Sequence, residues 1–362
     1  MSHAERRNKI RRQLKHEGLD GLLVTNFVNV TYLTGFTGDD SYLFVGAKND
    51  VLISDQRYTT QLEEECPGLE LCIRGPGTKI LDFAFKTIEK AKVRKLGIEA
   101  DSMTVGTRDA LSAAAPTVTL ETTSGWVEEL RMVKDRAEID ATRVACDMAR
   151  RAFEVVRAKI TPSMTEAEVS AELEYQARRF GAKGLSFEPI VGVGPRSALP
   201  HGHATNKQIG EAEFTLIDWG VHERLYMSDL TRVLATGKIS PKLRKLYGVV
   251  LKAQLAGIEA IRPGAVCEDV DAAARAVIEK AGYGKHFGHG LGHSLGLEIH
   301  ENPRFAKGNK TVLKPGMIMT VEPGIYFPEW GGIRIEDDVL VTRTGHEVLT
   351  SVPKELDECI VA

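Results

Sequence analysis

The sequence lacks any long apolar run, and this absence excludes one whole class of protein. No stretch approaches the run of about 18 apolar residues that indicates a transmembrane helix. Residues 1–18 are rich in charge and contain no apolar segment of the kind that a secretory signal peptide needs. We therefore expect a protein without a membrane partner.

Cysteine is scarce, and neither sign of charge dominates. The five cysteines, Cys66, Cys72, Cys146, Cys267 and Cys359, are odd in number and form no CxxC motif. This pattern predicts free thiols in a reducing cytoplasm. The 47 Lys and Arg residues nearly balance the 50 Asp and Glu residues, which leaves a net charge of −3. Such a balance gives no reason to expect nucleic acid as a partner.

A glycine-rich dinucleotide motif is missing as well. No GxGxxG follows an early strand, and the glycines of GHGLGHSLG at 288–296 are interleaved with histidines, which argues against a Rossmann-type enzyme. What the chain does contain is 362 residues, of which 43% are hydrophobic and 27% are charged. That is enough material for two globular cores.

The first third of the chain, residues 1–124, predicts a small α/β domain. Gly18 suits the left-handed cap at the end of its first helix. Apolar strand patterns at 21–25, 42–47, 50–54, 69–74 and 95–100 are joined by helical patterns near 4–17, 57–65, 78–92 and 105–115.

Residues 125–362 predict a second domain of the α+β class. Helices are expected over 126–159, after the capping box Thr165-x-x-Glu168, after Ser240-Pro241 and over about 267–281. Antiparallel strand patterns accompany these helices in two segments of the chain, 126–236 and 240–350. Each segment contributes one pair of acidic residues.

The first acidic pair lies in EFTLIDWGVHERLYMSDLTRVLAT at 213–236. This segment predicts a β-hairpin with a polar turn near 220–224. Asp218 and Asp229 are expected within its two apolar strands, where strand pairing brings both carboxylates toward one point.

The second acidic pair follows a stretch that is dense in histidine. Four of the ten histidines fall within 286–300, and the predicted strands MTVEPGIY (319–326) and GGIRIEDDVLV (331–341) then carry Glu322 and Glu336. Because burying an unpaired carboxylate costs several kcal/mol, each of these residues predicts a cation as its partner. His293 is a third possible ligand, and the cation is therefore expected to be a metal ion.

Together the candidates amount to two Asp, two Glu and one His. Oxygen donors with one imidazole suit Mn²⁺, Co²⁺ or Zn²⁺ better than they suit a thiolate-type structural zinc site. Two ions at a spacing of about 3.5–4 Å require bridging carboxylates, which this set contains.

These residues in this order resemble the pita-bread metallopeptidases, and within them the Xaa-Pro branch of prolidase (Xaa-Pro dipeptidase) and aminopeptidase P. Further likeness lies in NVTYLTGFTG (29–38) and LISDQRYTTQ (52–61), which are similar to the amino-terminal domain of creatinase and prolidase. The resemblance implies a creatinase-like domain over 1–124 and a pseudo-symmetric pita-bread catalytic domain over 125–362. Two departures are Asp39-Asp40 after TGFTG, and Ser294, which stands where the family has glycine.

The resemblance also implies a metal centre of two divalent ions, with Mn²⁺ favoured over Co²⁺ or Zn²⁺. It implies that Asp218 chelates one ion, that His293 and Glu322 hold the other, and that Asp229 and Glu336 bridge them. Glu322 would in addition act as the general base for a metal-bridging hydroxide.

Five further residues receive roles from the resemblance or from their position. His300 matches a histidine that stabilises the tetrahedral intermediate, and His201 matches one that contacts substrate. His289 is expected on the substrate side of the metal centre. Arg334 is expected to orient the ligand carboxylates or to meet a substrate carboxylate, and Arg304 to bind the free carboxylate of a dipeptide.

The implied function is a cytoplasmic, homodimeric exopeptidase that cleaves Xaa-Pro bonds in peptides. Prolidase is slightly favoured, and aminopeptidase P acting on Xaa-Pro-Yaa peptides is the alternative. A methionine aminopeptidase shares the five ligands but lacks a preceding domain like 1–124. A creatinase-type enzyme or a catalytically weak binding protein of the same fold has lost the ligands, and all five are present here.

Overall fold

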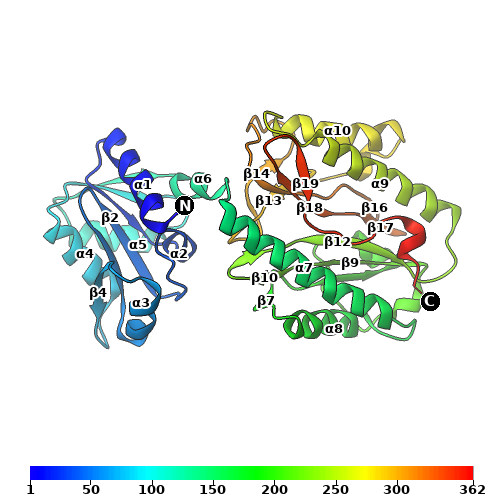
Figure 1. Ribbon diagram of the computed structural model, residues 1–362, viewed down its shortest axis with the longest axis horizontal. Coiled ribbons are helices and arrows are strands. Elements are labelled where there is room, and N and C mark those ends of the chain that lie inside the picture. The colour runs from blue at the N-terminus through cyan, green and yellow to red at the C-terminus, as the bar shows by residue number, and fades with distance from the viewer. Residues whose placement is uncertain (362) are drawn as a thin grey trace. The chain divides into compact units, whose positions relative to one another are not determined.

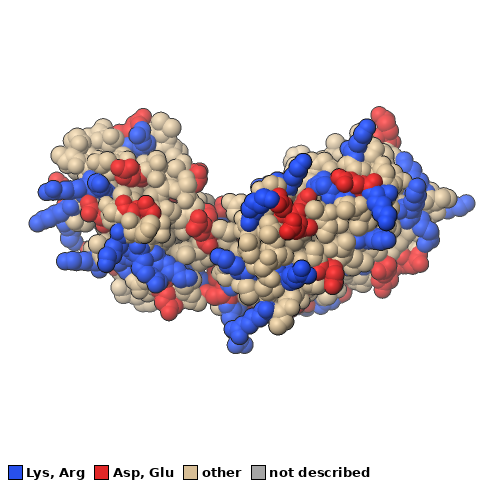
Figure 2. Space-filling model, turned by 90° about the horizontal axis from the view of Figure 1, so that it is seen from above, with Lys and Arg blue, Asp and Glu red and all other residues tan. Residues whose placement is uncertain are grey.

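The computed structural model describes residues 1–361, which divide into two compact units, one up to Arg131 and the other from Met132 onward (Figure 1). Both signs of charge are interspersed over the face shown in Figure 2. Within the described residues, no helix combines the length and the apolar character that crossing a membrane would require.

The first unit is built around a six-stranded mixed sheet in the order β4-β3-β2-β1-β5-β6. Its strands are β1 (Gly21–Val24), β2 (Ser41–Gly46), β3 (Asp50–Asp55), β4 (Glu70–Arg74), β5 (Lys95–Glu99) and β6 (Thr119–Thr123). Its helices are α1 (His3–Glu17), α2 (Phe27–Thr34), α3 (Thr59–Glu65), α4 (Ile80–Lys90), α5 (Val105–Ala114) and α6 (Trp126–Arg131). Leu23, Phe44, Ile53 and Ile98 are buried in its core. The predicted α/β character is confirmed.

Two elements of this unit, α2 and β6, were not predicted. The sequence of α2, FVNVTYLT, is rich in β-branched residues, which favour strands. The Asn26 side chain accepts hydrogen bonds from the Val28 and Asn29 amides and begins the helix, and Gly35 ends it at a φ of 87°. Capping therefore outweighs intrinsic propensity here.

The second unit contains four long helices. They are α7 (Arg136–Lys159), α8 (Glu166–Arg179), α9 (Pro241–Ala260) and α10 (Cys267–Lys280). The predicted continuous helix over 126–159 is wrong, because the chain leaves the helical conformation between α6 and α7. Asp135 then begins α7 with a capping box, in which its side chain accepts from the Glu138 amide and the Glu138 side chain accepts from the Asp135 amide.

The strands of the second unit form several antiparallel sheets, with orders that include β12-β9-β8 and β14-β13-β15-β18-β19. They are β7 (Gly184–Leu185), β8 (Ile190–Val193), β9 (Phe214–Trp219), β10 (Val221–Glu223), β11 (Tyr226–Met227), β12 (Leu230–Ala235), β13 (Gly292–Ser294), β14 (Glu301–Phe305), β15 (Ile318–Val321), β16 (Gly324–Phe327), β17 (Gly331–Arg334), β18 (Asp337–Val341) and β19 (His346–Val348). Short 3₁₀ helices lie at Gln56–Tyr58, Gly194–Ala198, Ile209–Glu211, Gly284–His286 and Leu356–Cys359. Helices α9 and α10 run along one side of the unit and α7 and α8 along the other (Figure 1). This mixed α+β arrangement agrees with the predicted fold class.

The predicted hairpin at 213–236 forms, but with an insertion. β9 pairs with β12 in an antiparallel register that places Asp218 opposite Thr231. The residues between them form β10 and β11, so that Asp229 lies immediately before β12 and not inside it. Gly220 is required at the neck of the insertion, because a Cβ atom there would lie 1.9 Å from the Ser228 carbonyl oxygen.

Glu322 and Glu336 also lie just outside strands, where the prediction placed them within strands. Glu322 follows β15, and Glu336 lies between β17 and β18. The Glu322 amide donates to the Leu291 carbonyl and so continues the β13–β15 register, whereas the Glu336 amide leaves this pattern and donates to the Thr231 carbonyl of β12. The bond from Glu336 links the second acidic pair to the strand that follows the first.

Candidate metal centre and surrounding pocket

One pocket in the second unit, of about 650 Å³, is lined by every residue that the sequence singled out for the site. These residues are His201, Asp218, Asp229, His289, His293, His300, Arg304, Glu322, Arg334 and Glu336. They come from both segments, 126–236 and 240–350, and the two acidic pairs therefore share one cavity.

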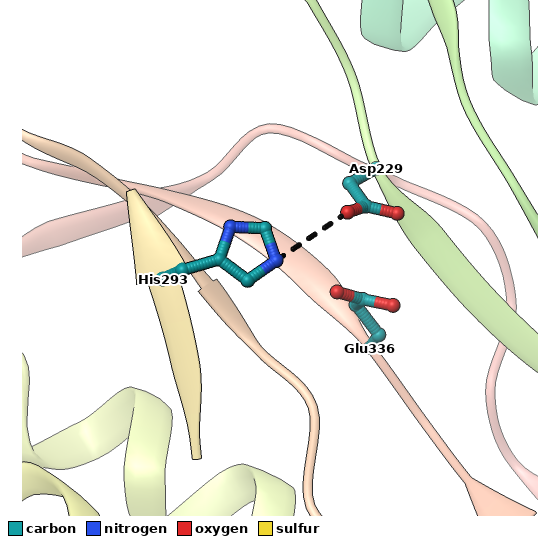
Figure 3. A group of neighbouring side chains, drawn as sticks. All are labelled: Asp229, His293 and Glu336. Atoms are coloured by element: carbon teal, nitrogen blue, oxygen red, sulfur yellow. Dashed lines mark ion pairs between the residues drawn. The ribbon is translucent and has the colours of Figure 1, made fainter. Parts of the chain in front are cut away.

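The centre of the pocket holds three buried groups that can ligate a metal ion. Asp229, His293 and Glu336 each offer one donor atom, and these atoms all lie within 4.8 Å of one another. Figure 3 shows that the three side chains converge from three different segments of the chain. Glu322 extends this cluster, with its Oε1 atom 3.6 Å from His293 Nε2.

The His293 ring presents a lone pair to the carboxylates. Its Nδ1 atom lies 3.0 Å from the Ser294 carbonyl oxygen, which can only accept, and the proton therefore resides on Nδ1. Burial lowers the pKa of His293 to about 4, with the neighbouring His300 lowering it further, so the ring is neutral at pH 7. The unprotonated Nε2 atom then lies 3.7 Å from Asp229 Oδ2, and two such electron-rich atoms call for a cation between them.

The carboxylates of the site are short of positive charge. Burial raises the pKa of Asp229 well above its usual range, and Glu336 raises it further. Burial and the Glu322 carboxylate act in the same way on the pKa of Glu336. Burial also raises the pKa of Glu322 to about 8, although the Arg334 guanidinium acts in the opposite direction. Crowded carboxylates with raised pKa values are the expected electrostatics of a site built for cations.

Two carboxylate oxygens of the site have no partner at all. Among residues 1–361, neither Asp218 Oδ1 nor Asp229 Oδ1 accepts a hydrogen bond, although both atoms are buried. Buried acceptors without a partner are costly and call for an explanation. Divalent ions fit the site: they would satisfy both oxygens, the His293 lone pair and the crowded carboxylates together.

A chain of hydrogen bonds links the first acidic pair to the second. Arg334 Nη2 donates to Asp218 Oδ2 over 2.5 Å, and Arg334 Nε donates to Thr231 Oγ1 over 3.1 Å. Thr231 Oγ1 in turn donates to Glu336 Oε2 over 2.6 Å. Arg334 therefore contacts Asp218 directly and Glu336 through Thr231, and its role in orienting these carboxylates stays a prediction. Thr231 was not singled out, although its position two residues after Asp229 was a usable signal.

Tyr326 is a second residue that the sequence reasoning missed. Its hydroxyl accepts from Arg334 Nη1 over 3.1 Å and lies 3.0 Å from His289 Nε2. Because His289 Nδ1 lies 2.8 Å from the Gly290 carbonyl oxygen and donates to it, Tyr326 is the donor to His289 Nε2. The pair thus forms one wall of the pocket.

His300 and Arg304 both lie next to His293. The rings of His293 and His300 meet edge to face, with centroids 4.5 Å apart. Burial and the Arg304 guanidinium lower the pKa of His300. Arg304 is exposed and lies opposite His293 in the β13–β14 register. His201 is also exposed, at the rim of the pocket.

The loop that carries His201 is anchored by Glu166, a fully buried residue that was not singled out. Glu166 Oε1 accepts from the Val193 amide, and Oε2 accepts from the Thr205 amide, each over 2.9 Å. Arg196 Nε donates to both oxygens. The first turn of α8 therefore fixes the start and the end of the segment that brings His201 to the pocket.

Three other histidines make contacts away from the metal cluster. His203 is exposed and pairs with Glu188. The ring of His286 lies within hydrogen-bond distance of the Tyr326 carbonyl, and that of His346 within the same distance of the Ile261 carbonyl.

Comparison with known proteins adds two family matches and several close likenesses. Residues 140–343 match the model of metallopeptidase family M24, and residues 6–133 match that of the creatinase/prolidase N-terminal domain. A solved Xaa-Pro dipeptidase from Bacillus anthracis is 41% identical, with a TM-score of 0.95 over 99% of this chain and 100% of that one. An X-Pro aminopeptidase structure from Thermotoga maritima is 35% identical, with a TM-score of 0.86 over 95% and 97%. The Xaa-Pro dipeptidase of Pyrococcus horikoshii is 35% identical over 97% of this chain and 98% of its own length.

Proposed function

The chain belongs to metallopeptidase family M24, and from this premise we propose that it is a dimetal exopeptidase that hydrolyses Xaa-Pro bonds. The observation that carries the proposal is the convergence of Asp229, His293 and Glu336, with Glu322 beside them, in one buried cluster. Relatives named Xaa-Pro dipeptidase and X-Pro aminopeptidase, similar over nearly the whole chain, support the choice of substrate.

The residues that would hold the two ions are Asp218, Asp229, His293, Glu322 and Glu336. Divalent ions bound there supply Lewis-acid polarisation of a carbonyl group and lower the pKa of water from about 15.7 to about 7. Mn²⁺ is the proposed ion, and Co²⁺ or Zn²⁺ would suit the same donors.

The protein's own groups then divide the remaining work. Glu322 acts as the general base, taking the proton of the attacking water and passing it to the leaving proline nitrogen. His300, whose ring is held beside that of His293, donates a hydrogen bond to the oxyanion that develops on the scissile carbonyl. His201 and His289 contact the substrate from the rim and from the wall.

Prolidase activity is slightly favoured over aminopeptidase P activity because of Arg304. A dipeptide ends in a free carboxylate at the proline, and a guanidinium at the pocket can pair with that group. Arg304 lines the pocket and is exposed to solvent. A longer Xaa-Pro-Yaa peptide has an amide at that place, and the Arg304 charge would then lack its anion.

The deciding experiment compares Mn²⁺-loaded protein on Xaa-Pro dipeptides and on Xaa-Pro-Yaa tripeptides, with Xaa-Ala dipeptides as the control. We expect cleavage of both proline series, with the dipeptides preferred, and little cleavage of Xaa-Ala. A tripeptide preference would replace prolidase with aminopeptidase P. Bound metal without turnover of any of these peptides would instead indicate a binding protein of the same fold. Cytoplasmic location and homodimer formation stay predictions.

A further inference from the structure

A buried lysine lies behind the pocket and takes no part in the chemistry proposed above. Lys134 lies just before α7, and its side chain is 1% exposed. Its Nζ atom donates to Ser294 Oγ over 3.0 Å and to Glu301 Oε2 over 3.1 Å. Ser294 directly follows His293, and Glu301 directly follows His300. One ammonium group therefore ties together the residues that come after both histidines.

Glu301 is the part of this contact that shapes the loop between the two histidines. Its Oε1 atom accepts from the Leu297 amide over 3.0 Å and from the Glu298 amide over 3.3 Å. The loop also packs tightly on the carboxylate, because a Cβ atom at Gly296 would lie 2.9 Å from both carboxylate oxygens. The Glu301 carboxylate thus closes the loop 295–300, and Lys134 forms an ion pair with it.

The two histidines differ in how they are held. His293 lies within β13, opposite Arg304, and its amide donates to Thr320 Oγ1 over 3.0 Å. His300 lies at the end of the loop, after a shift in the β13–β14 register between His293 and Ser294. The sheet therefore positions His293, and the position of His300 depends on the loop that Glu301 closes.

We propose that Lys134 is a positioning residue that, through Glu301, sets the place of the His300 ring against the reacting carbonyl. This inference rests on the proposed function, since it gives His300 a task in peptide hydrolysis. Without the ammonium group, the nearly buried Glu301 carboxylate would lose its ion pair with Lys134 and would shift from its present place. The loop would move with it, and a displacement of about 1 Å at a reacting group can lower a rate by about 10²-fold.

The first test is kinetic and uses Lys134→Met, which keeps the length of the side chain and removes its charge. We expect kcat on an Xaa-Pro substrate to fall by about 10–100-fold, with metal content unchanged and KM changed by less than about threefold. The double variant Lys134→Met/Glu301→Gln removes both charges. Its kcat should be higher than that of Lys134→Met, and the decrease in log kcat relative to wild type should be smaller by at least about a third. Lys252→Met, at an exposed position of α9, is the matched control and should behave as wild type.

The second test does not depend on turnover. In Zn²⁺-loaded protein labelled with ¹⁵N-histidine, the imidazole resonances of His300 should shift in Lys134→Met and return toward wild type in the double variant. Those of the remote His346 should stay in place.

Two outcomes would overturn the role of Lys134. One is an unmoved His300 resonance or a wild-type kcat in Lys134→Met protein that remains folded. The other is loss of metal together with kcat, which would make Lys134 a support of His293 instead. If wild type cleaves no Xaa-Pro substrate, the proposed function fails, and the resonances alone decide whether Lys134 positions His300.

Discussion

Arg334 Nη2 lies 2.5 Å from Asp218 Oδ2, and this ion pair is buried among the other carboxylates of the site. The pair joins β17 to β9, and hence the second acidic pair of the sequence to the first. Through Thr231 the same guanidinium also reaches Glu336. Arg334 therefore holds two proposed metal ligands in place from a single strand.

Loss of this guanidinium should destabilise the protein strongly. Arg334→Met leaves the Asp218 carboxylate buried without its cation, which typically costs about 3–5 kcal/mol in the free energy of unfolding. Chemical denaturation of metal-free protein measures this loss. Arg343→Met, at an exposed position, should change the free energy by less than about 0.5 kcal/mol. Equal stability of the two variants would mean that the pair contributes no more than a surface contact.

Metal content should depend on the two proposed bridging residues. We expect about two divalent ions per chain in active protein, because the ligand set contains carboxylates that can bridge two ions. Asp229→Ala and Glu336→Ala should each lose both ions and all activity, whereas the exposed control Glu63→Ala should keep both. Elemental analysis of the purified variants gives the answer. An active enzyme without transition metal would exclude the proposed chemistry.

The metal-free protein should lose stability as the pH rises from about 6.5 to about 8. The pKa of Glu322 is raised from 4.5 to about 8 in the folded protein, so the folded state holds a proton that the unfolded state has released across this window. Asp229 and Glu336, whose pKa values are also raised, act in the same direction. His293 makes the folded protein more stable as the pH rises, because its pKa is lowered from 6.5 to about 4 by folding. This contribution is confined to the pH range between about 4 and 6.5.

Thermal unfolding in the presence of a chelator, at pH 6.5 and pH 8, tests this dependence. Added Mn²⁺ should reverse it, because ions bind the deprotonated carboxylates and stabilise the folded state more at the higher pH. Glu322→Gln removes one of the buried carboxyl groups with a raised pKa and should weaken the dependence. A metal-free protein that is more stable at pH 8 would show that the carboxylates are not crowded in solution.

The location of the site was predictable from local pattern, because buried acidic and histidine side chains among apolar residues are visible in the sequence. Asp218 lies on β9, where its strand pattern places it. The exact position of Glu336 was not predictable, since its backbone amide bonds to the Thr231 carbonyl, in a segment remote in sequence. A strand pattern contains no information about such a bond.

The residues that support the site were hidden for the same reason. Lys134 contacts Glu301 across 167 positions of the chain, and Glu166 binds Arg196 across 30. A lone Lys or Glu in a helical region is normally a solvated residue, and nothing local marks it as buried. The contacts that make these two residues important exist only after folding.

His300 and His293 should separate as catalyst and ligand. His300→Ala should lower kcat by about 10²–10³-fold, because it removes one hydrogen bond to the developing oxyanion, and should leave the metal content near that of wild type. His293→Ala should deplete the metal. Parallel kinetics and elemental analysis distinguish the two, and a loss of metal in His300→Ala would mean that the two assignments are reversed.

Arg304 should determine the preferred length of the substrate. It lies on β14 opposite His293, and within residues 1–361 its guanidinium forms no ion pair, so it is available to an anion in the pocket. Arg304→Ala should raise KM for Xaa-Pro dipeptides by about 10–100-fold, equivalent to about 1.4–2.8 kcal/mol of binding, and should change KM for Xaa-Pro-Yaa little. Lys307→Ala, exposed and nearby in sequence, serves as the control for a general loss of positive charge. Equal effects of Arg304→Ala on both substrates would remove the argument for a carboxylate clamp, and with it the preference for prolidase over aminopeptidase P.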